Sequence, residues 1–156
     1  MKIKIIVLGK IKEEYFKIAI NEYSKRLSKF CNIEFIELQD EKVKEYSYEN
    51  NIIKYKEFIK IEKVLNKNSF IISLDEKGKN LNSIEFSNLI KNTFFNYKEI
   101  SFIIGSSVGL HENLIKISNF KLSLSKMTLT HQMVRLFLIE QIYRSFKIIN
   151  NEPYHK

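Results

Sequence analysis

Short apolar runs alternate with amphipathic stretches along the whole chain, and this alternation limits the possible folds more than any other feature. We expect strands, from β-branched or alternating apolar residues, at residues 2–8, 33–38, 70–74, 100–104 and 121–125. We expect helices, from apolar residues at helical spacing, at residues 12–30, 50–65, 82–96, 111–118 and 131–149. Strands that alternate with helices predict an α/β fold with a mostly parallel sheet. The 156 residues contain no linker or repeat, so we expect one domain over residues 1–156.

The spacing of apolar residues also assigns a core face to two of these helices. Candidates on the first helix are Tyr15, Ile18, Ala19, Tyr23, Leu27 and Phe30. Candidates on the second helix are Ile52, Ile53, Tyr55, Ile59 and Leu65. The third helix begins with capping-box spacing at Asn82 and Glu85. Gly78, shortly before it, indicates a turn after the third strand.

The charge balance favours a polyanionic partner. There are 26 Lys and Arg against 18 Asp and Glu, a formal net charge of +8, and a basic excess of this size suits nucleic acid better than a neutral metabolite. No basic amphipathic helix is segregated enough to favour a membrane surface. The first apolar run is too short for a signal peptide or a membrane span, so we expect a cytoplasmic protein. Cys31 is the only cysteine, which excludes an internal disulfide, and we expect it to be a packed residue.

Three predicted strands end in distinctive segments, at residues 74–78, 105–110 and 124–129. In open α/β sheets ligands bind beyond the carboxyl ends of the strands, so the three segments could line one pocket. The GSSVG sequence at 105–109 lacks the glycines and the lysine of the known phosphate loops and is weak evidence for a nucleotide site. The three histidines are too scattered to indicate a metal site, and we expect none.

The C-terminal segment concentrates the rarest residue types of the chain, with two of the three histidines, two of the three arginines and the only proline. A frayed tail is one interpretation and a functional site is the other. Apolar residues surround the helix at 131–149, which predicts burial on more than one side and is most simply explained by an interface with a second subunit. Glu140 and Arg144 have the spacing of an ordinary helix ion pair. Arg135 and Arg144 could instead bind RNA phosphates.

Three segments together carry a family resemblance that covers nearly the whole chain: MKIKIIVLGKIKEEYFKIAINEYSKRL, FIIGSSVGLHENL and LSLSKMTLTHQMVRLFLIEQIYRSFKIINNEPYHK. With them the chain resembles the small ribosomal large-subunit methyltransferase H family of bacteria, pseudouridine N3-methyltransferases of the SPOUT superfamily. The resemblance implies an α/β fold with a C-terminal trefoil knot, a rare exception to the rule that chains do not thread loops. It also implies a homodimer, S-adenosyl-L-methionine as methyl donor, and as substrate a pseudouridine in helix 69 of 23S rRNA within the ribosome.

The same resemblance implies where the donor binds. The residues carried over are Leu74, Gly105, Leu124, Ser125, Lys126, Met127, Thr128 and Leu129. Backbone groups and apolar walls would hold the donor there, and glycine would permit its close approach.

The acceptor side is expected at the C-terminal tail. His155 is the candidate to take the proton from N3 or to position the substrate, because a histidine can accept a proton near neutral pH. Tyr154 and Arg144 complete the candidate catalytic set. The alternative is that the tail, including Lys156, binds phosphate or packs against the partner subunit.

The chain departs from the family pattern at two positions. Most relatives have a second glycine where this chain has Ser106, and a proline where it has Thr130. We expect Ser106 to narrow the donor pocket and Thr130 to remove a rigid bend, without loss of a reacting group. A noncatalytic RNA-binding or ribosome-associated module on the same fold is the alternative function.

Overall fold

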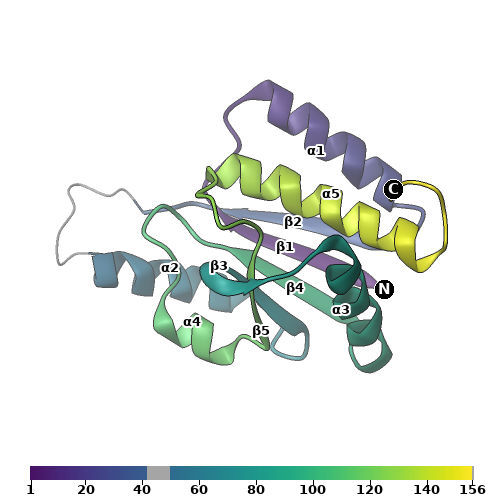
Figure 1. Ribbon diagram of the computed structural model, residues 1–156. Helices are drawn as coiled ribbons and strands as arrows, with labels where there is room; N and C mark the ends of the chain where they lie inside the picture. The colour runs from purple at the N-terminus through teal and green to yellow at the C-terminus, as the bar shows by residue number, and fades with distance from the viewer. Residues whose placement is uncertain (42–49, 156) are drawn as a thin grey trace.

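The computed structural model describes residues 1–41 and 50–155, so Lys156 of the predicted tail lies outside the described residues. Every expected strand and helix is present (Figure 1). The strands are β1 (Lys2–Leu8), β2 (Asn32–Leu38), β3 (Phe70–Asn80), β4 (Glu99–Ile104) and β5 (Phe120–Ser123). The helices are α1 (Glu14–Leu27), α2 (Asn50–Val64), α3 (Ser83–Asn96), α4 (Glu112–Ile117) and α5 (His131–Ile149).

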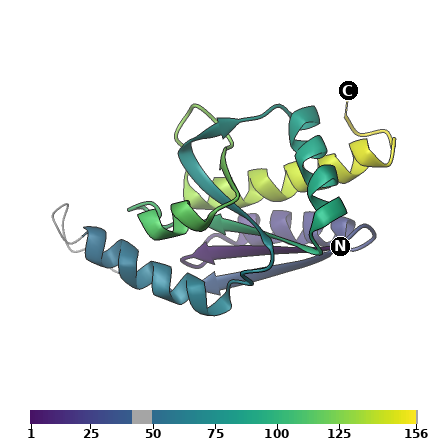
Figure 2. The same cartoon turned by 90° about the horizontal axis from the view of Figure 1, so that it is seen from below.

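The five strands form one parallel sheet in the order β2-β1-β4-β3-β5. Helices α1, α3 and α5 cover one face, and α2 and α4 cover the other, so the predicted α/β architecture is confirmed (Figure 1; Figure 2). A parallel sheet needs this cover on both faces, because its connecting helices pack back onto it. None of the described helices is long and apolar enough to cross a membrane.

Strand β1 shows how one sequence serves both faces. Its alternate residues Ile3, Ile5 and Val7 face the α1, α3 and α5 side, and Ile6 and Leu8 face α2 and α4. All five side chains are buried, as the continuous apolar run predicts for a central strand.

Strand β3 is longer than the predicted 70–74, and the turn predicted at Gly78 is wrong. The strand continues to Asn80, and its pairing with β5 shifts register between Leu74 and Lys79. A Cβ on Gly78 would lie 2.7 Å from the backbone carbon of Leu122. The glycine therefore permits a close approach of two strands at a bulge, a role that a sequence does not distinguish from a turn.

The core face predicted for α1 is partly wrong. Tyr15 and Ile18 are 65% and 63% exposed, whereas Phe16, Ile20 and Leu27 are buried. The helix carries two apolar stripes, and it packs on α5 through the one that includes Ile20 and Leu27. Similarly, Ile52 and Tyr55 of α2 are exposed, whereas Ile53 and Leu65 are buried as predicted.

Local predictions from side-chain chemistry fared better. The capping box of α3 is present: the Glu85 backbone N–H donates to Asn82 Oδ1 and the Asn82 N–H donates to Glu85 Oε2, both at 2.8 Å. Cys31 is buried, and this burial raises the pKa of its thiol to about 11, as suits a packed and unreactive residue.

We expect the substitution Gly78→Ala to destabilise the protein by about 1–3 kcal/mol, because the added Cβ must push β5 away from β3. Urea unfolding of the purified variant measures this loss. Lys79→Ala, at an exposed position of the same strand, is the matched control and should unfold like the wild type. Equal midpoints for G78A and the wild type would contradict the close approach.

Candidate functional site

The three segments singled out in the sequence lie side by side at one edge of the sheet, although the first, at 74–78, lies within β3 where its pairing with β4 ends and not after the strand. Leu74 of β3 pairs with Ile104 of β4 on one side and with Leu122 of β5 on the other. Gly105 follows Ile104 directly, and Leu124 follows the last residue of β5. The parallel direction of the strands thus brings the segments at 74–78, 105–110 and 124–129 to the same edge.

The segment at 105–109 is a tight turn rather than a phosphate loop. Ser106 and Gly109 form an isolated bridge, and the Gly109 backbone N–H donates to the Ser106 carbonyl at 3.0 Å. Gly109 has a φ of +81°, which favours glycine. A Cβ on Gly105 would lie 2.8 Å from Leu110 Cδ2, so a larger residue there would require the Leu110 side chain to shift.

The Ser106 side chain is bound to α2 through its hydroxyl. Ser106 Oγ donates to Glu57 Oε2 at 2.7 Å, and the backbone N–H of Glu41 donates to Glu57 Oε1 at 3.1 Å. Glu57 is only 1% exposed, and burial raises the pKa of its carboxyl group. Sequence analysis missed Glu57, and an acidic residue on a helix gives no signal of this kind.

The loop at 124–129 presents backbone and apolar groups. Leu124 and Leu129 are half-buried, whereas Lys126, Met127 and Thr128 are exposed. Local hydrogen bonds fix the path of the loop. Ser123 Oγ donates to the Ser125 carbonyl at 3.0 Å, and the Met127 backbone N–H donates to Ser125 Oγ at 2.9 Å. Within residues 1–41 and 50–155, the backbone N–H groups of Lys126, Thr128 and Leu129 have no protein acceptor.

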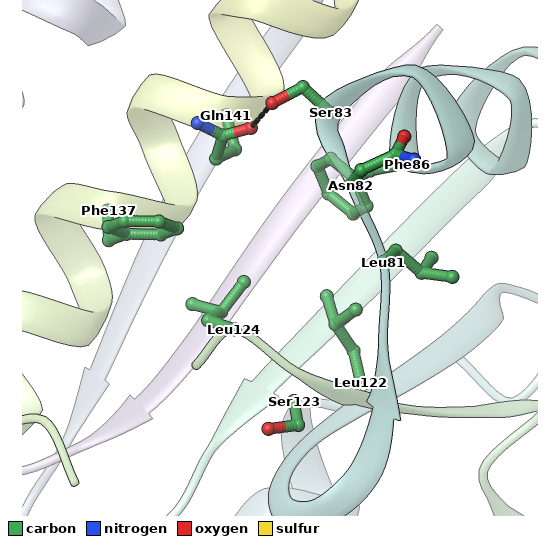
Figure 3. Close-up of a pocket in the computed structure, with 9 residues that line it drawn as sticks. All are labelled: Leu81, Asn82, Ser83, Phe86, Leu122, Ser123, Leu124, Phe137 and Gln141. Carbon is green, nitrogen blue, oxygen red and sulfur yellow. Dashed lines mark hydrogen bonds between the residues drawn. The ribbon is translucent and has the colours of Figure 1, made fainter. Parts of the chain in front are cut away.

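Beside this loop lies a cavity of about 220 Å³ between β5, α3 and α5 (Figure 3). Of the predicted site residues, only Leu124 lines it. Leu81, Phe86 and Phe137 supply further apolar walls, and Ser83 Oγ donates to Gln141 Oε1 at 2.8 Å across the opening. Sequence analysis missed Phe137 and Gln141, although their spacing of four residues places them on one face of α5.

The loop passes into α5 at Thr130 and His131. Thr130 is the N-cap, and its hydroxyl accepts from the Met133 backbone N–H at 3.4 Å, so it replaces a rigid bend with a helix cap. His131 is the first residue of α5, and its side chain is half-buried. Burial and the neighbouring charge of Arg135 lower the pKa of His131, which favours the neutral ring.

The suggestion that Arg135 binds RNA phosphates is wrong. Its side chain is 1% exposed and satisfies groups inside the protein. Nη2 donates to the carbonyls of Leu8 at 3.2 Å and Gly9 at 2.7 Å, and Nη1 donates to Glu37 Oε1 at 3.0 Å. An arginine in a helix reads as exposed in a sequence, and only the fold reveals the strand ends that it meets.

The candidate acceptor residues cluster at the other end of α5. Arg144 makes the predicted ion pair with Glu140, with Nη2 at 2.5 Å from Oε1. The Tyr154 hydroxyl donates to the same oxygen at 3.2 Å, and the Arg144 guanidinium carbon lies 4.7 Å from the Tyr154 ring centre. Burial, followed by the hydrogen bond with Tyr23, raises the pKa of Tyr154. His155 beside it is exposed.

A family model described as "Predicted SPOUT methyltransferase" matches residues 1–155. The chain belongs to the SPOUT methyltransferase family. It is similar to proteins named Ribosomal RNA large subunit methyltransferase H from Clostridium botulinum (strain Kyoto / Type A2), at 52% identity, and from Clostridium kluyveri (strain NBRC 12016), at 48% identity. Each match covers 100% of both chains.

Solved structures agree on the fold. A probable methylase family protein from Haemophilus influenzae Rd KW20 superimposes with a TM-score of 0.61 at 11% identity, over 99% of this chain and 70% of that chain. Membership of the SPOUT family also implies a C-terminal trefoil knot.

SPOUT methyltransferases use S-adenosyl-L-methionine as methyl donor, and the loop at 124–129 fits such a molecule. Its unpaired backbone N–H groups can bind the acceptor nitrogens of an adenine, and Leu124 and Leu129 offer apolar contact. In the described residues no group of three or more His, Cys, Asp or Glu is placed to hold a metal ion.

The loop at 124–129 and the C-terminal tail lie at opposite ends of α5. Thr130 leads from the loop into α5, and Tyr154 follows its last turn, so the 19 residues of the helix separate the two by roughly 28 Å (Figure 1). A single chain therefore does not bring Tyr154 and His155 to the strand ends at Leu74 and Gly105.

We expect Arg135→Met to destabilise the protein by about 3–5 kcal/mol, because it removes the charged donor that Glu37 and two backbone carbonyls share. Urea unfolding measures the loss. Arg26→Met is the control, since the Arg26 ion pair with Glu22 is exposed and its removal should leave the midpoint nearly unchanged. An R135M protein of wild-type stability with weakened RNA binding would restore the phosphate-binding interpretation.

Proposed function

We propose that this protein transfers a methyl group from S-adenosyl-L-methionine to N3 of a pseudouridine in helix 69 of 23S rRNA. It acts in the cytoplasm as a homodimer of single-domain subunits, without a metal. The observation that carries the proposal is the full-length similarity to proteins named Ribosomal RNA large subunit methyltransferase H, with which the chain shares 48–52% of its residues. The net charge of +8 also suits an RNA substrate.

The donor would be held at the strand ends of β3, β4 and β5. Leu74, Leu124 and Leu129 would contact its apolar parts, and the backbone of the 124–129 loop, from Ser125 through Lys126 and Met127 to Thr128, would bind its polar edge. The missing side chain at Gly105 allows Leu110 to pack closely against the backbone at the end of β4. The bound donor supplies a sulfonium methyl group that is displaced in line, so the site must chiefly align two molecules and exclude water.

The tail would serve the acceptor. N3 of pseudouridine carries a proton that must leave as the new bond forms, and the exposed imidazole of His155 would accept it. Tyr154 would face the base from its position against Arg144, and the Arg144 guanidinium, already oriented by Glu140, would contact an RNA phosphate.

The separation of loop and tail supports a homodimer whose sites are shared. With roughly 28 Å between the two ends of α5, the tail of one subunit can serve the donor loop of the other if two α5 helices pack side by side. Met133 and Phe137, 41% and 40% exposed on one stripe of α5, offer an apolar surface for that packing.

Calorimetric titration tests the donor, and mass mapping of helix 69 tests the target. We expect one donor site per subunit, and a methyl group on the helix 69 pseudouridine that disappears from cells lacking the protein. Absence of donor binding with RNA binding intact would instead identify a noncatalytic RNA-binding module. If the protein binds the donor but the methylation of helix 69 is the same in cells with and without it, the protein is a methyltransferase with another target.

Subunit mixing tests the shared site. Leu129→Arg places a charge on the apolar wall of the donor loop, and His155→Ala removes the proposed proton acceptor, so each homodimer should be inactive. Random reassociation of equal amounts should restore about one quarter of the sites, because half of the dimers are mixed and each mixed dimer has one intact site. Activity should stay absent if donor loop and tail of the same chain work together.

A further inference from the structure

Two glutamates are buried in the described structure, and they differ in what surrounds them. Glu99, at the start of β4, lies beside the ammonium groups of Lys2 and Lys4. Glu57, on α2, is more deeply buried, and the described partners of its carboxyl oxygens are neutral: the Ser106 hydroxyl and the Glu41 backbone N–H. Burying a carboxylate among neutral partners costs stability, so a well-packed apolar residue would suit the fold alone better.

The contacts of Glu57 join three segments at the edge of the sheet where the strands end. Glu57 itself lies on α2. The residues that it contacts are Glu41, which follows β2, and Ser106, which follows β4. Ser106 is the residue next to Gly105, and it forms the bridge with Gly109 that closes the turn at 105–109. Glu57 therefore holds this turn from the α2 side of the sheet.

We propose that Glu57 is a positioning residue of the donor site, which fixes the turn at Gly105–Gly109 through the Ser106 hydroxyl. The inference rests on the proposed function, because it assumes that the turn borders the bound donor. A site that holds its ligand through backbone groups depends on a fixed backbone, since half an ångström of drift is enough to lose hydrogen-bond geometry. Ser106 and Glu57 thus act as a matched pair: without the hydroxyl the buried carboxylate loses one of its two partners.

Three variants separate positioning from simple packing. Glu57→Ala and Ser106→Ala each remove the contact. Glu57→Gln should keep it, because its oxygen can accept from the Glu41 N–H while its amide donates to Ser106 Oγ. Glu99→Ala is the control, since it breaks a buried glutamate at the far end of β4, roughly 20 Å from the turn.

The first measurement follows the turn itself and needs no donor. The chain has only four glycines, so nitrogen-15 glycine labelling gives one backbone amide signal each for Gly9, Gly78, Gly105 and Gly109. We expect E57A and S106A to shift and broaden the Gly105 and Gly109 signals while Gly78 stays in place. E57Q should resemble the wild type, and E99A should leave the two turn signals unmoved. Unchanged turn signals in both E57A and S106A would overturn the proposal.

The second measurement links the turn to the donor. We expect E57A and S106A to weaken S-adenosyl-L-methionine binding about tenfold by calorimetry, with the double variant no weaker than E57A. Because the substitutions weaken donor binding and remove no reacting group, kcat at saturating donor should change much less than KM. E99A should lower the melting temperature and leave donor affinity unchanged.

The outcomes distinguish the two proposals. If the wild type binds no donor, the proposed function fails and the positioning role fails with it. If the wild type binds donor and E57A and S106A bind it equally well, only the positioning role fails. A loss of affinity in E99A as large as in E57A would assign the effect to general destabilisation and would also overturn the inference.

Discussion

The hydrogen bonds of one buried guanidinium, that of Arg135, hold the last helix against the first strand. The carbonyls of Leu8 and Gly9 mark the carboxyl end of β1, and Glu37 belongs to the end of β2, so three acceptors from two strands meet one side chain of α5. A buried guanidinium is costly unless such acceptors surround it. Because the contact also fixes the start of α5, it holds the exit of the 124–129 loop, whose entry is held by the pairing of β5 with β3.

The loop at 124–129 is held at both ends, although the chain has two residues that are unusual for the family. Methyl transfer needs alignment more than it needs reactive side chains on the donor side. What must be conserved physically is the path of the backbone, and different residues can secure it. At position 130 a threonine caps α5 through its hydroxyl. At position 106 a serine adds a hydroxyl that donates a hydrogen bond to the buried Glu57. Each departure from the family pattern thus brings its own hydrogen bond.

Sequence reasoning succeeded where the signal is local or periodic, and failed where it depends on the third dimension. The order of strands and helices, the capping box at Asn82 and the shared edge of the strand ends followed from patterns along the chain. The buried stripe of α1 did not, because Tyr15 and Phe16 both belong to plausible apolar faces and only the position of α5 decides between them. The roles of Arg135, Glu57 and Gly78 could not be predicted for the same reason, because each role depends on contact with a strand or turn that is distant in sequence.

The geometry of α5 connects these features to the proposed homodimer. One side of the helix buries Arg135 and the core residues, and another leaves Met133 and Phe137 partly exposed next to the cavity that Leu124 lines. A second copy of the chain that covered this stripe would close the open side of the donor loop. It would also bring its own Tyr154 and His155 toward that loop if the two helices ran in opposite directions. The rigid helix that keeps loop and tail apart in one subunit would then set the distance at which the two meet across the pair.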